Sequence, residues 1–156
     1  MEKEAVLRAV RARIEADLEA AIRAQADAVQ GATHEEARPE NDKDTRGLEQ
    51  SYLARGLAAR VDELEQAKSA FLSISGARSR VGLGALVVVE DEEGETQVYL
   101  VGPAAGGLEV EVEGETVKVI TPSSPLGRAL VGKGAEDEAT VRAPKGVREL
   151  VILRVA

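Results

Sequence analysis

The stretch FLSISGARSRVGLGALVVVED, Phe71 to Asp91, decides the fold, because the spacing of apolar residues changes inside it. Upstream of it, apolar residues recur at every third or fourth position, which is typical of amphipathic helices. Downstream they follow the two-residue alternation of β-strands. The change predicts an α+β chain with a helical domain over residues 1–76 and a sheet domain over residues 77–156.

Toward the N-terminus, two apolar stripes have helical spacing. The first comprises Leu7, Val10, Ile14, Leu18, Ile22 and Val29, and the second comprises Leu53, Leu57, Val61, Leu64 and Phe71. Two helices of about 30 residues joined by a short loop pack antiparallel. The pattern therefore predicts an antiparallel two-helix coiled coil over residues 2–36 and 44–74, with the connecting turn as its far tip.

Toward the C-terminus, six short β-rich runs follow one another. They are GALVVVED, TQVYLVG, LEVEVEG, TVKVI, ATVRAP and VRELVILRV. The acidic run from Glu90 to Glu95 separates the first two and is interpreted as a solvated hairpin turn. One helix interrupts the strands, with Ser124 as its N-cap, Pro125 at its first position and Gly132 as its stop. These signals predict a twisted antiparallel sheet with one short helix packed on it.

Composition argues against several kinds of function. The 156 residues include no Cys, no Trp, one His, two Tyr and one Phe, so thiol chemistry, multi-histidine metal sites and base-stacking surfaces are not expected. The net charge of −8 argues against autonomous binding of duplex DNA, although a local basic patch can still contact DNA or RNA held by a partner. No apolar run reaches the ~20 residues that span a bilayer. We expect a cytoplasmic protein with no membrane contact and no permanently bound cofactor.

The turn between the two predicted helices carries Glu40, Asp42 and Asp44. Local physics favours a structural interpretation, in which Asp44 caps the second helix and Glu40 and Asp42 are solvated turn residues. In the functional alternative, these carboxylates at the end of a long coiled coil supply oxygen ligands to a hard cation such as Mg²⁺ in the active site of another protein.

The tail VITPSSPLGRALVGKGAEDEATVRAPKGVRELVILRV, Val119 to Val155, resembles the C-terminal domain of the Gre family of bacterial transcription elongation factors, GreA and GreB. The similarity extends from Val81 to Val155 and is ungapped from Ser124 to Lys133. The resemblance implies an FKBP-like fold that follows a coiled coil and docks at the rim of the secondary channel of RNA polymerase. Within that domain we expect the docking surface to be the loop and helix start at Pro122, Ser123, Ser124 and Pro125, because a loop of fixed shape on a sheet scaffold makes a good contact surface. The resemblance also implies a protein that is not itself an enzyme.

The resemblance gives the acidic tip a role. In cleavage-competent members, an Asp and a Glu three residues later hold an Mg²⁺ in the polymerase active site, where water hydrolyses the end of a backtracked transcript. Aligned through ARVDELE, the Asp position falls on Glu40 and the Glu position on Lys43, so this chain departs from the pattern. Glu40 and Asp42 are then the candidate ligands of an Mg²⁺ shared with the polymerase, Asp44 completes the acidic tip, and contact with the nascent RNA is indirect.

Three functions follow from these observations. The first is an elongation factor that stimulates the polymerase's own transcript cleavage through Glu40, Asp42 and Asp44. The second is a non-cleaving regulator or inhibitor that occupies the same channel. The third is a peptidyl-prolyl isomerase, which ranks last because such a pocket needs aromatic walls and the second domain offers only Tyr99.

Overall fold

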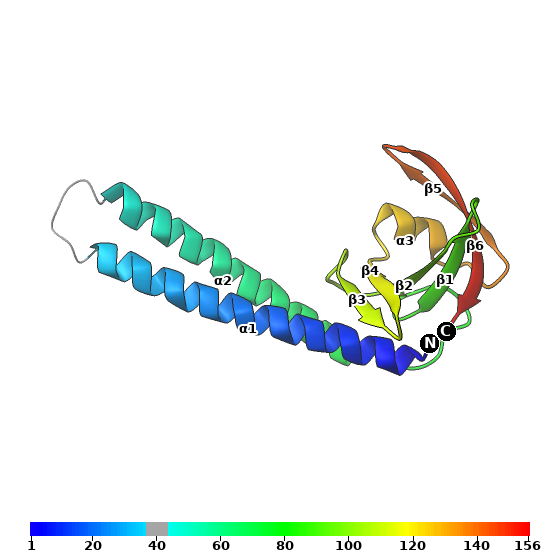
Figure 1. Cartoon of the computed structure of the whole chain (residues 1–156), viewed down its shortest axis with the longest axis horizontal. Helices are drawn as coiled ribbons and strands as arrows, with labels where there is room; N and C mark the ends of the chain where they lie inside the picture. The colour runs from blue at the N-terminus through cyan, green and yellow to red at the C-terminus, as the bar shows by residue number, and fades with distance from the viewer. Residues whose placement is uncertain (37–43) are drawn as a thin grey trace. The chain divides into compact units, whose positions relative to one another are not determined.

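The computed structural model describes the backbone of residues 1–36 and 44–156, and their side chains except those of residues 32–36, 44–47 and 50. Two long helices, α1 (Lys3–Glu36) and α2 (Asp44–Leu72), precede six strands and a short helix, α3 (Pro125–Leu130) (Figure 1). The helix bounds agree with the predicted ranges to within two residues. The predicted α+β fold class, two long helices followed by a sheet with one short helix, is confirmed.

By its internal contacts the chain divides into two compact units. One is Ile14–Lys68, which contains most of both long helices. The other joins Met1–Arg13 to Ser69–Ala156, so the sheet unit includes the first turns of α1 and the end of α2. The division into domains predicted at residue 76 stays a prediction.

In the helical unit, the buried seam differs in part from the predicted stripe. The buried side chains are Ile14, Leu18, Ala21 and Ala28 on α1, and Val61, Leu64 and Ala67 on α2. Ile22 and Val29, both predicted in the stripe, are 45% and 46% exposed. In an α-helix, four residues advance about 40° more than one full turn, so repeated steps of four move a stripe away from the partner helix. A coiled-coil seam instead alternates steps of three and four residues. Ala21 and Ala28 therefore take the seam positions.

An ion pair joins the two helices in this unit. The ammonium Nζ of Lys68 lies 2.6 Å from a carboxylate oxygen of Glu15, and both side chains are nearly half exposed. The hydrogen bond to Glu15 raises the pKa of Lys68 above its ordinary value. The pair joins α1 and α2 at this level but contributes little stability, because exposed ion pairs are screened by water and salt.

The six strands form one sheet in the order β3-β4-β2-β1-β6-β5. Their bounds are β1 (Leu86–Asp91), β2 (Thr96–Val101), β3 (Glu109–Val112), β4 (Glu115–Ile120), β5 (Glu138–Ala143) and β6 (Gly146–Val155). Four neighbouring pairs are antiparallel as predicted, but β2 and β4 are parallel, which corrects the expectation of a wholly antiparallel sheet. The chain leaves β2, forms β3 at the sheet edge and returns as β4 between them, so β4 runs in the direction of β2.

Both faces of the sheet are covered within the sheet unit. One face packs against α3 in a core that includes Val87, Val101, Ile120 and Leu130. On the other face, the ring of Phe71, at the end of α2, packs so closely that a Cβ added at Gly102 would lie 2.6 Å from its Cζ atom and 2.9 Å from Val119. Val6, Leu7, Val10 and Phe71 are fully buried. The helix ends therefore complete the hydrophobic core of this unit.

Two cationic side chains of α1 satisfy carbonyl groups where α2 ends. Arg11 donates through Nε and Nη2 to the Phe71 carbonyl, at 3.1 and 2.9 Å, and through Nη2 to the Ile74 carbonyl at 2.9 Å. Lys3 donates to the Gly76 carbonyl, and its partial burial lowers its pKa. The last carbonyls of a helix have no partner within the helix, so these contacts hold the connection to β1 against α1.

Candidate functional site

The acidic tip falls where the structure is not described. Glu40 and Asp42 lie outside the described residues, and so does the side chain of Asp44, the residue at which α2 begins. The tip's metal and capping roles therefore stay predictions. Among the described residues, no group of three or more His, Cys, Asp or Glu side chains is placed to hold a metal ion.

The second predicted site, Pro122 to Pro125, is a loop of defined shape that leads into α3. Ser124 has an extended backbone and caps the helix: its Oγ accepts from the Gly127 N–H at 3.0 Å and donates to the Thr121 carbonyl at 2.8 Å. Pro125 occupies the first turn, where its missing N–H costs nothing. Ser123 and Pro125 are exposed. The predicted cap and first helical position are confirmed, and the loop presents an exposed surface on a rigid support.

Close packing beneath the loop fixes its path. A Cβ added at Gly127 would lie 1.9 Å from the Thr121 carbonyl oxygen and 3.0 Å from Cα of Pro122. Only glycine allows α3 to approach the loop this closely. Gly132, with φ of +87°, follows the helix as predicted. The capping signal was readable from the sequence, whereas the role of Gly127 depends on this approach.

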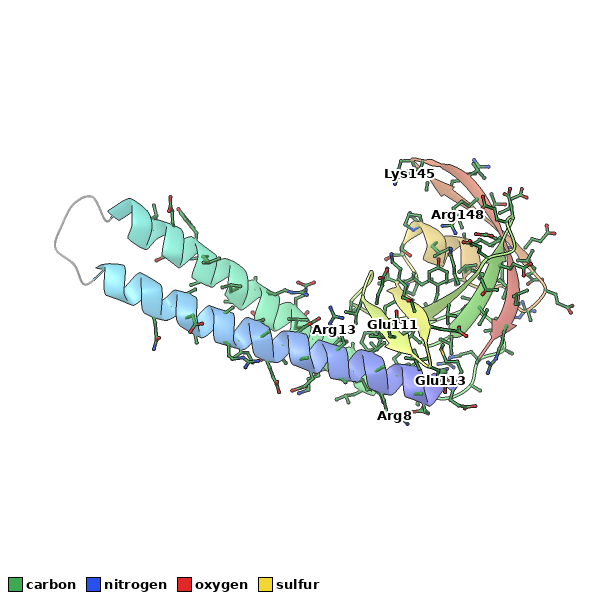
Figure 2. The ribbon with its side chains drawn as sticks, viewed as in Figure 1. Arg8, Arg13, Glu111, Glu113, Lys145 and Arg148 are labelled. Atoms are coloured by element: carbon green, nitrogen blue, oxygen red, sulfur yellow. The ribbon has the colours of Figure 1, made fainter. Side chains whose placement is uncertain are left out.

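A cleft of about 490 Å³ opens beside the same loop, between the start of α3 and the strands. Its lining includes the apolar side chains of Tyr99, Ile120, Val141 and Leu126, together with Ser124 and Pro125 of the loop. Lys118 and Arg148 also line it, and Arg148 lies on the side of the β5–β6 hairpin that faces α3 (Figure 2). We did not predict this cleft from the sequence, since it brings together residues from four strands and a helix.

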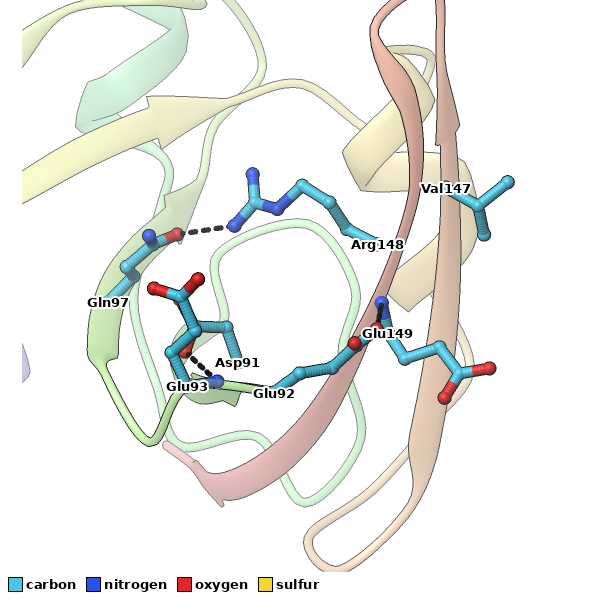
Figure 3. Close-up of a pocket in the computed structure, with 7 residues that line it drawn as sticks. All are labelled: Asp91, Glu92, Glu93, Gln97, Val147, Arg148 and Glu149. Atoms are coloured by element: carbon cyan, nitrogen blue, oxygen red, sulfur yellow. Dashed lines mark hydrogen bonds between the residues drawn. The ribbon is translucent and has the colours of Figure 1, made fainter.

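Next to the cleft, a recess of about 350 Å³ is lined mainly by carboxylates of the β1–β2 turn and β6 (Figure 3). The Asp91 carboxylate accepts from the N–H groups of Glu93 and Glu95, both at 2.9 Å, and Glu92 accepts from the Glu149 N–H at 3.2 Å. The acidic run from Glu90 to Glu95 thus forms a hairpin turn, as predicted. Within this run, the carboxylates of Asp91 and Glu92 bind backbone N–H groups and so stabilise the local backbone.

None of the helices in the described part of the chain combines the length and the apolar character needed to cross a bilayer.

Comparison with known proteins identifies the family. The family described as "Transcription elongation factor, GreA/GreB, C-term" matches residues 76–156. Transcription elongation factor GreA of Syntrophobacter fumaroxidans is 45% identical over 78 residues, which cover 49% of this chain and 46% of that protein. Transcription inhibitor protein Gfh1 of Thermus thermophilus is 33% identical over 119 residues, which cover 74% of this chain and 73% of that protein.

Among solved structures, the GreA factor homolog 1 (Gfh1) protein of Thermus thermophilus aligns over 94% of both chains, with 27% identity and a TM-score of 0.40. The match to the GreA of Syntrophobacter fumaroxidans spans less than half of that relative. The family match covers more than half of this chain. The chain therefore belongs to the GreA/GreB family of transcription elongation factors. These two relatives carry the names of a transcription elongation factor and a transcription inhibitor.

Proposed function

We propose that this protein binds bacterial RNA polymerase at the secondary channel through its C-terminal domain and presents the coiled-coil tip to the active site, where it stimulates transcript cleavage in backtracked complexes. The observation that carries the proposal is the family match over residues 76–156. The loop at Pro122, Ser123, Ser124 and Pro125 supports it, because a capped and closely packed loop keeps its shape when free and therefore loses little entropy on docking.

In this proposal the tip residues assist the polymerase and do not form an enzyme of their own. Glu40 and Asp42 supply carboxylate oxygens to an Mg²⁺ shared with the polymerase, and Asp44 adds negative charge beside them. Carboxylates are ligands that Mg²⁺ prefers, and a pair of metal ions stabilises the attacking and leaving oxygens of phosphodiester hydrolysis. Any contact with the nascent RNA is then made within the polymerase complex, in the cytoplasm.

A second function is favoured by two observations. Gfh1 of Thermus thermophilus, which aligns with this chain over 73% of its own length, is named a transcription inhibitor. In addition, Lys43 stands where cleavage-competent members carry the second carboxylate, and an ammonium repels a metal ion nearby. In this alternative the protein occupies the same channel and blocks or tunes access to the active site without promoting cleavage.

One experiment separates the two functions. A stalled, backtracked elongation complex is incubated with the protein and Mg²⁺, and transcript length is followed with time. Shortened transcripts that resume elongation support cleavage stimulation. Full-length stalled transcripts together with slower elongation support the inhibitor. If the protein neither binds the polymerase nor changes transcript length, both proposals are wrong.

The acidic tip is tested by the double variant Glu40→Ala with Asp42→Ala. The matched control is Asp27→Ala with Glu49→Ala, which removes two exposed carboxylates from the described parts of the same helices. We expect unchanged melting and polymerase binding for both variants, because exposed charges change stability by less than about 0.5 kcal/mol. The effect on transcription should be lost only in the tip variant, and a tip variant with full effect would show that these carboxylates are turn residues.

A further inference from the structure

The strand β5 forms one edge of the sheet and is built to accept a further strand. It is the last strand in the order β3-β4-β2-β1-β6-β5 (Figure 1). An edge strand presents a row of backbone N–H and C=O groups that another chain can pair with, unless a bulge, a proline or repelling charges prevent this. β5 pairs with β6 without a register shift from Glu138 to Ala143, and its sequence EATVRA contains no proline. Its edge is therefore regular over its whole length.

The charges on the exposed face of β5 are complementary to themselves. Glu138, Thr140 and Arg142 are exposed in that order, while Ala139 and Val141 are buried on the other face. Among the described residues, no ion pair involves Glu138 or Arg142. If β5 of a second copy lies antiparallel with Thr140 opposite Thr140, Glu138 of each copy stands opposite Arg142 of the other. Opposite charges in such positions stabilise the pairing of strands.

This complementarity selects one register. Within β5, only the register centred on Thr140 places both charges opposite their counterparts. A shift of the centre by one residue leaves neither charge opposite its counterpart in β5, and a shift by two sets like charges against each other, which disfavours pairing. The strand therefore carries information about a particular partner, and that partner is a second copy of the same strand.

Exposed apolar side chains of β6 flank the charged positions. Arg142 lies opposite Val147, and Glu138 lies opposite Val151, across the β5–β6 hairpin. The two valines are 62% and 38% exposed. In the register centred on Thr140, each pair of Glu138 and Arg142 lies in a row between Val151 of one copy and Val147 of the other. The methylene stem of an arginine covers apolar surface while its guanidinium binds a carboxylate, so the pairing also removes apolar surface from water.

The other edge of the sheet lacks this complementarity. β3 exposes Glu109 and Glu111 on one face, so a second copy of β3 that lay antiparallel with the same face outward would set carboxylates opposite carboxylates. Like charges in these positions are destabilising. In addition, the guanidinium of Arg13 donates to the Glu109 carbonyl at 3.4 Å. Charge therefore opposes self-pairing at β3 and favours it at β5.

We propose that two copies of this chain associate through their β5 strands, with Thr140 on the two-fold axis and Glu138 of each copy paired with Arg142 of the other. The sheet then continues from one chain into the next. A single pair of short strands buries less surface than a standard stable interface, so the association is weak and reversible. The inference concerns the free protein and does not rest on the proposed function.

The test is a charge exchange followed by sedimentation equilibrium of the full-length chain. The dissociation constant of the dimer is measured from micromolar to millimolar concentration, at low and at high salt, for Arg142→Glu, for Glu138→Arg and for the variant with both changes. The control is Arg154→Glu, which makes the same change of charge at an exposed position of β6, an inner strand of the sheet. Circular dichroism establishes that each variant is folded.

We expect each single reversal to raise the dissociation constant by roughly tenfold or more, because it sets like charges opposite each other at both symmetric positions. The double variant restores opposite charges in reversed order and should return to within about threefold of the unmodified protein. Arg154→Glu should stay within about twofold, because it changes the long-range field alone. High salt should weaken the association of the unmodified protein.

Four results would overturn the inference. The unmodified protein could stay monomeric at millimolar concentration, or it could self-associate with a constant that neither single reversal changes, which would place the contact on another surface. The double variant could remain as weak as the single ones, which would show that Glu138 and Arg142 do not face each other. Finally, a monomeric protein whose affinity for core RNA polymerase falls with Arg142→Glu but not with Arg154→Glu would assign the edge to the polymerase.

Discussion

Replacement of Gly127 by alanine tests whether close packing beneath the loop holds it in place. In an unconstrained helix, Gly→Ala stabilises by about 1 kcal/mol. At Gly127 the new Cβ would stand 1.9 Å from the Thr121 carbonyl oxygen and 2.9 Å from its carbon. These are backbone atoms, so relief requires the loop or α3 to move by more than about 1 Å, since C···O contacts are normally about 3.3 Å or longer.

The magnitude follows from these two opposing effects. Overpacking in a well-packed region costs about 1–3 kcal/mol, and the 1.9 Å approach places this substitution at the upper end of that range. After the gain in helix propensity, we expect a net loss of about 2 kcal/mol in the free energy of unfolding of the sheet unit. For a unit of roughly 100 residues this lowers the melting temperature by about 8–16 °C.

Differential scanning calorimetry measures the effect, and Gly56→Ala in α2 is its control. Apart from its chain neighbours and the nearby backbone of its own helix, no described heavy atom lies within 4 Å of a Cβ added at Gly56. The same chemical change there should therefore stabilise the helical unit by about 1 kcal/mol. Opposite signs for the two variants are the expected result. A Gly127→Ala protein that melts at or above the unmodified protein would refute the argument that the Thr121 carbonyl and α3 fix the loop.

Three further variants test other contacts. Arg11→Met removes the donors to the Phe71 and Ile74 carbonyls where α2 ends and should lower the free energy of unfolding by about 2 kcal/mol. Its control, Arg8→Met at an exposed position, should change the free energy of unfolding by less than about 0.5 kcal/mol. Urea denaturation measures both variants. Ser124→Ala removes the α3 cap and should cost about 1 kcal/mol in the same assay, with much of the stability restored by Ser124→Asp. The hydrogen bond to Glu15 raises the pKa of Lys68 above 10.5, so its stabilisation is complete below pH 10.5 and is lost as pH rises through the raised pKa. The melting temperature of the helical unit should therefore fall more steeply above pH 10.5 than that of Lys68→Met, and equal slopes would contradict this.

Features that depend on a few consecutive residues were readable from the sequence. The observed bounds of the two long helices lie within two residues of the predicted bounds, because apolar spacing and helix propensity are properties of one segment of chain. The start of α3 at Ser124 and Pro125, and its stop at Gly132, follow from backbone groups that need partners at helix ends. The loop at Pro122 to Pro125 was predicted as a docking surface because a fixed loop on a sheet scaffold makes a good contact surface, and the structure shows Ser123 and Pro125 exposed in it.

Features that depend on which segments meet were decided only by the tertiary structure. Alternation along β2 and β4 indicates which side chains share a face, but it carries no information about strand order or direction, so their parallel pairing was not foreseen. Likewise, the spacing of Ile22 and Ala21 permits either to enter the coiled-coil seam, and only packing against α2 selects the alanine. The cleft joins Tyr99, Lys118, Val141 and Arg148 across four strands, because sheet order places residues distant in sequence side by side. Amino-acid order therefore determined the local elements and their ends, while the cleft and the strand order arose from contacts between elements, which local periodicity does not encode.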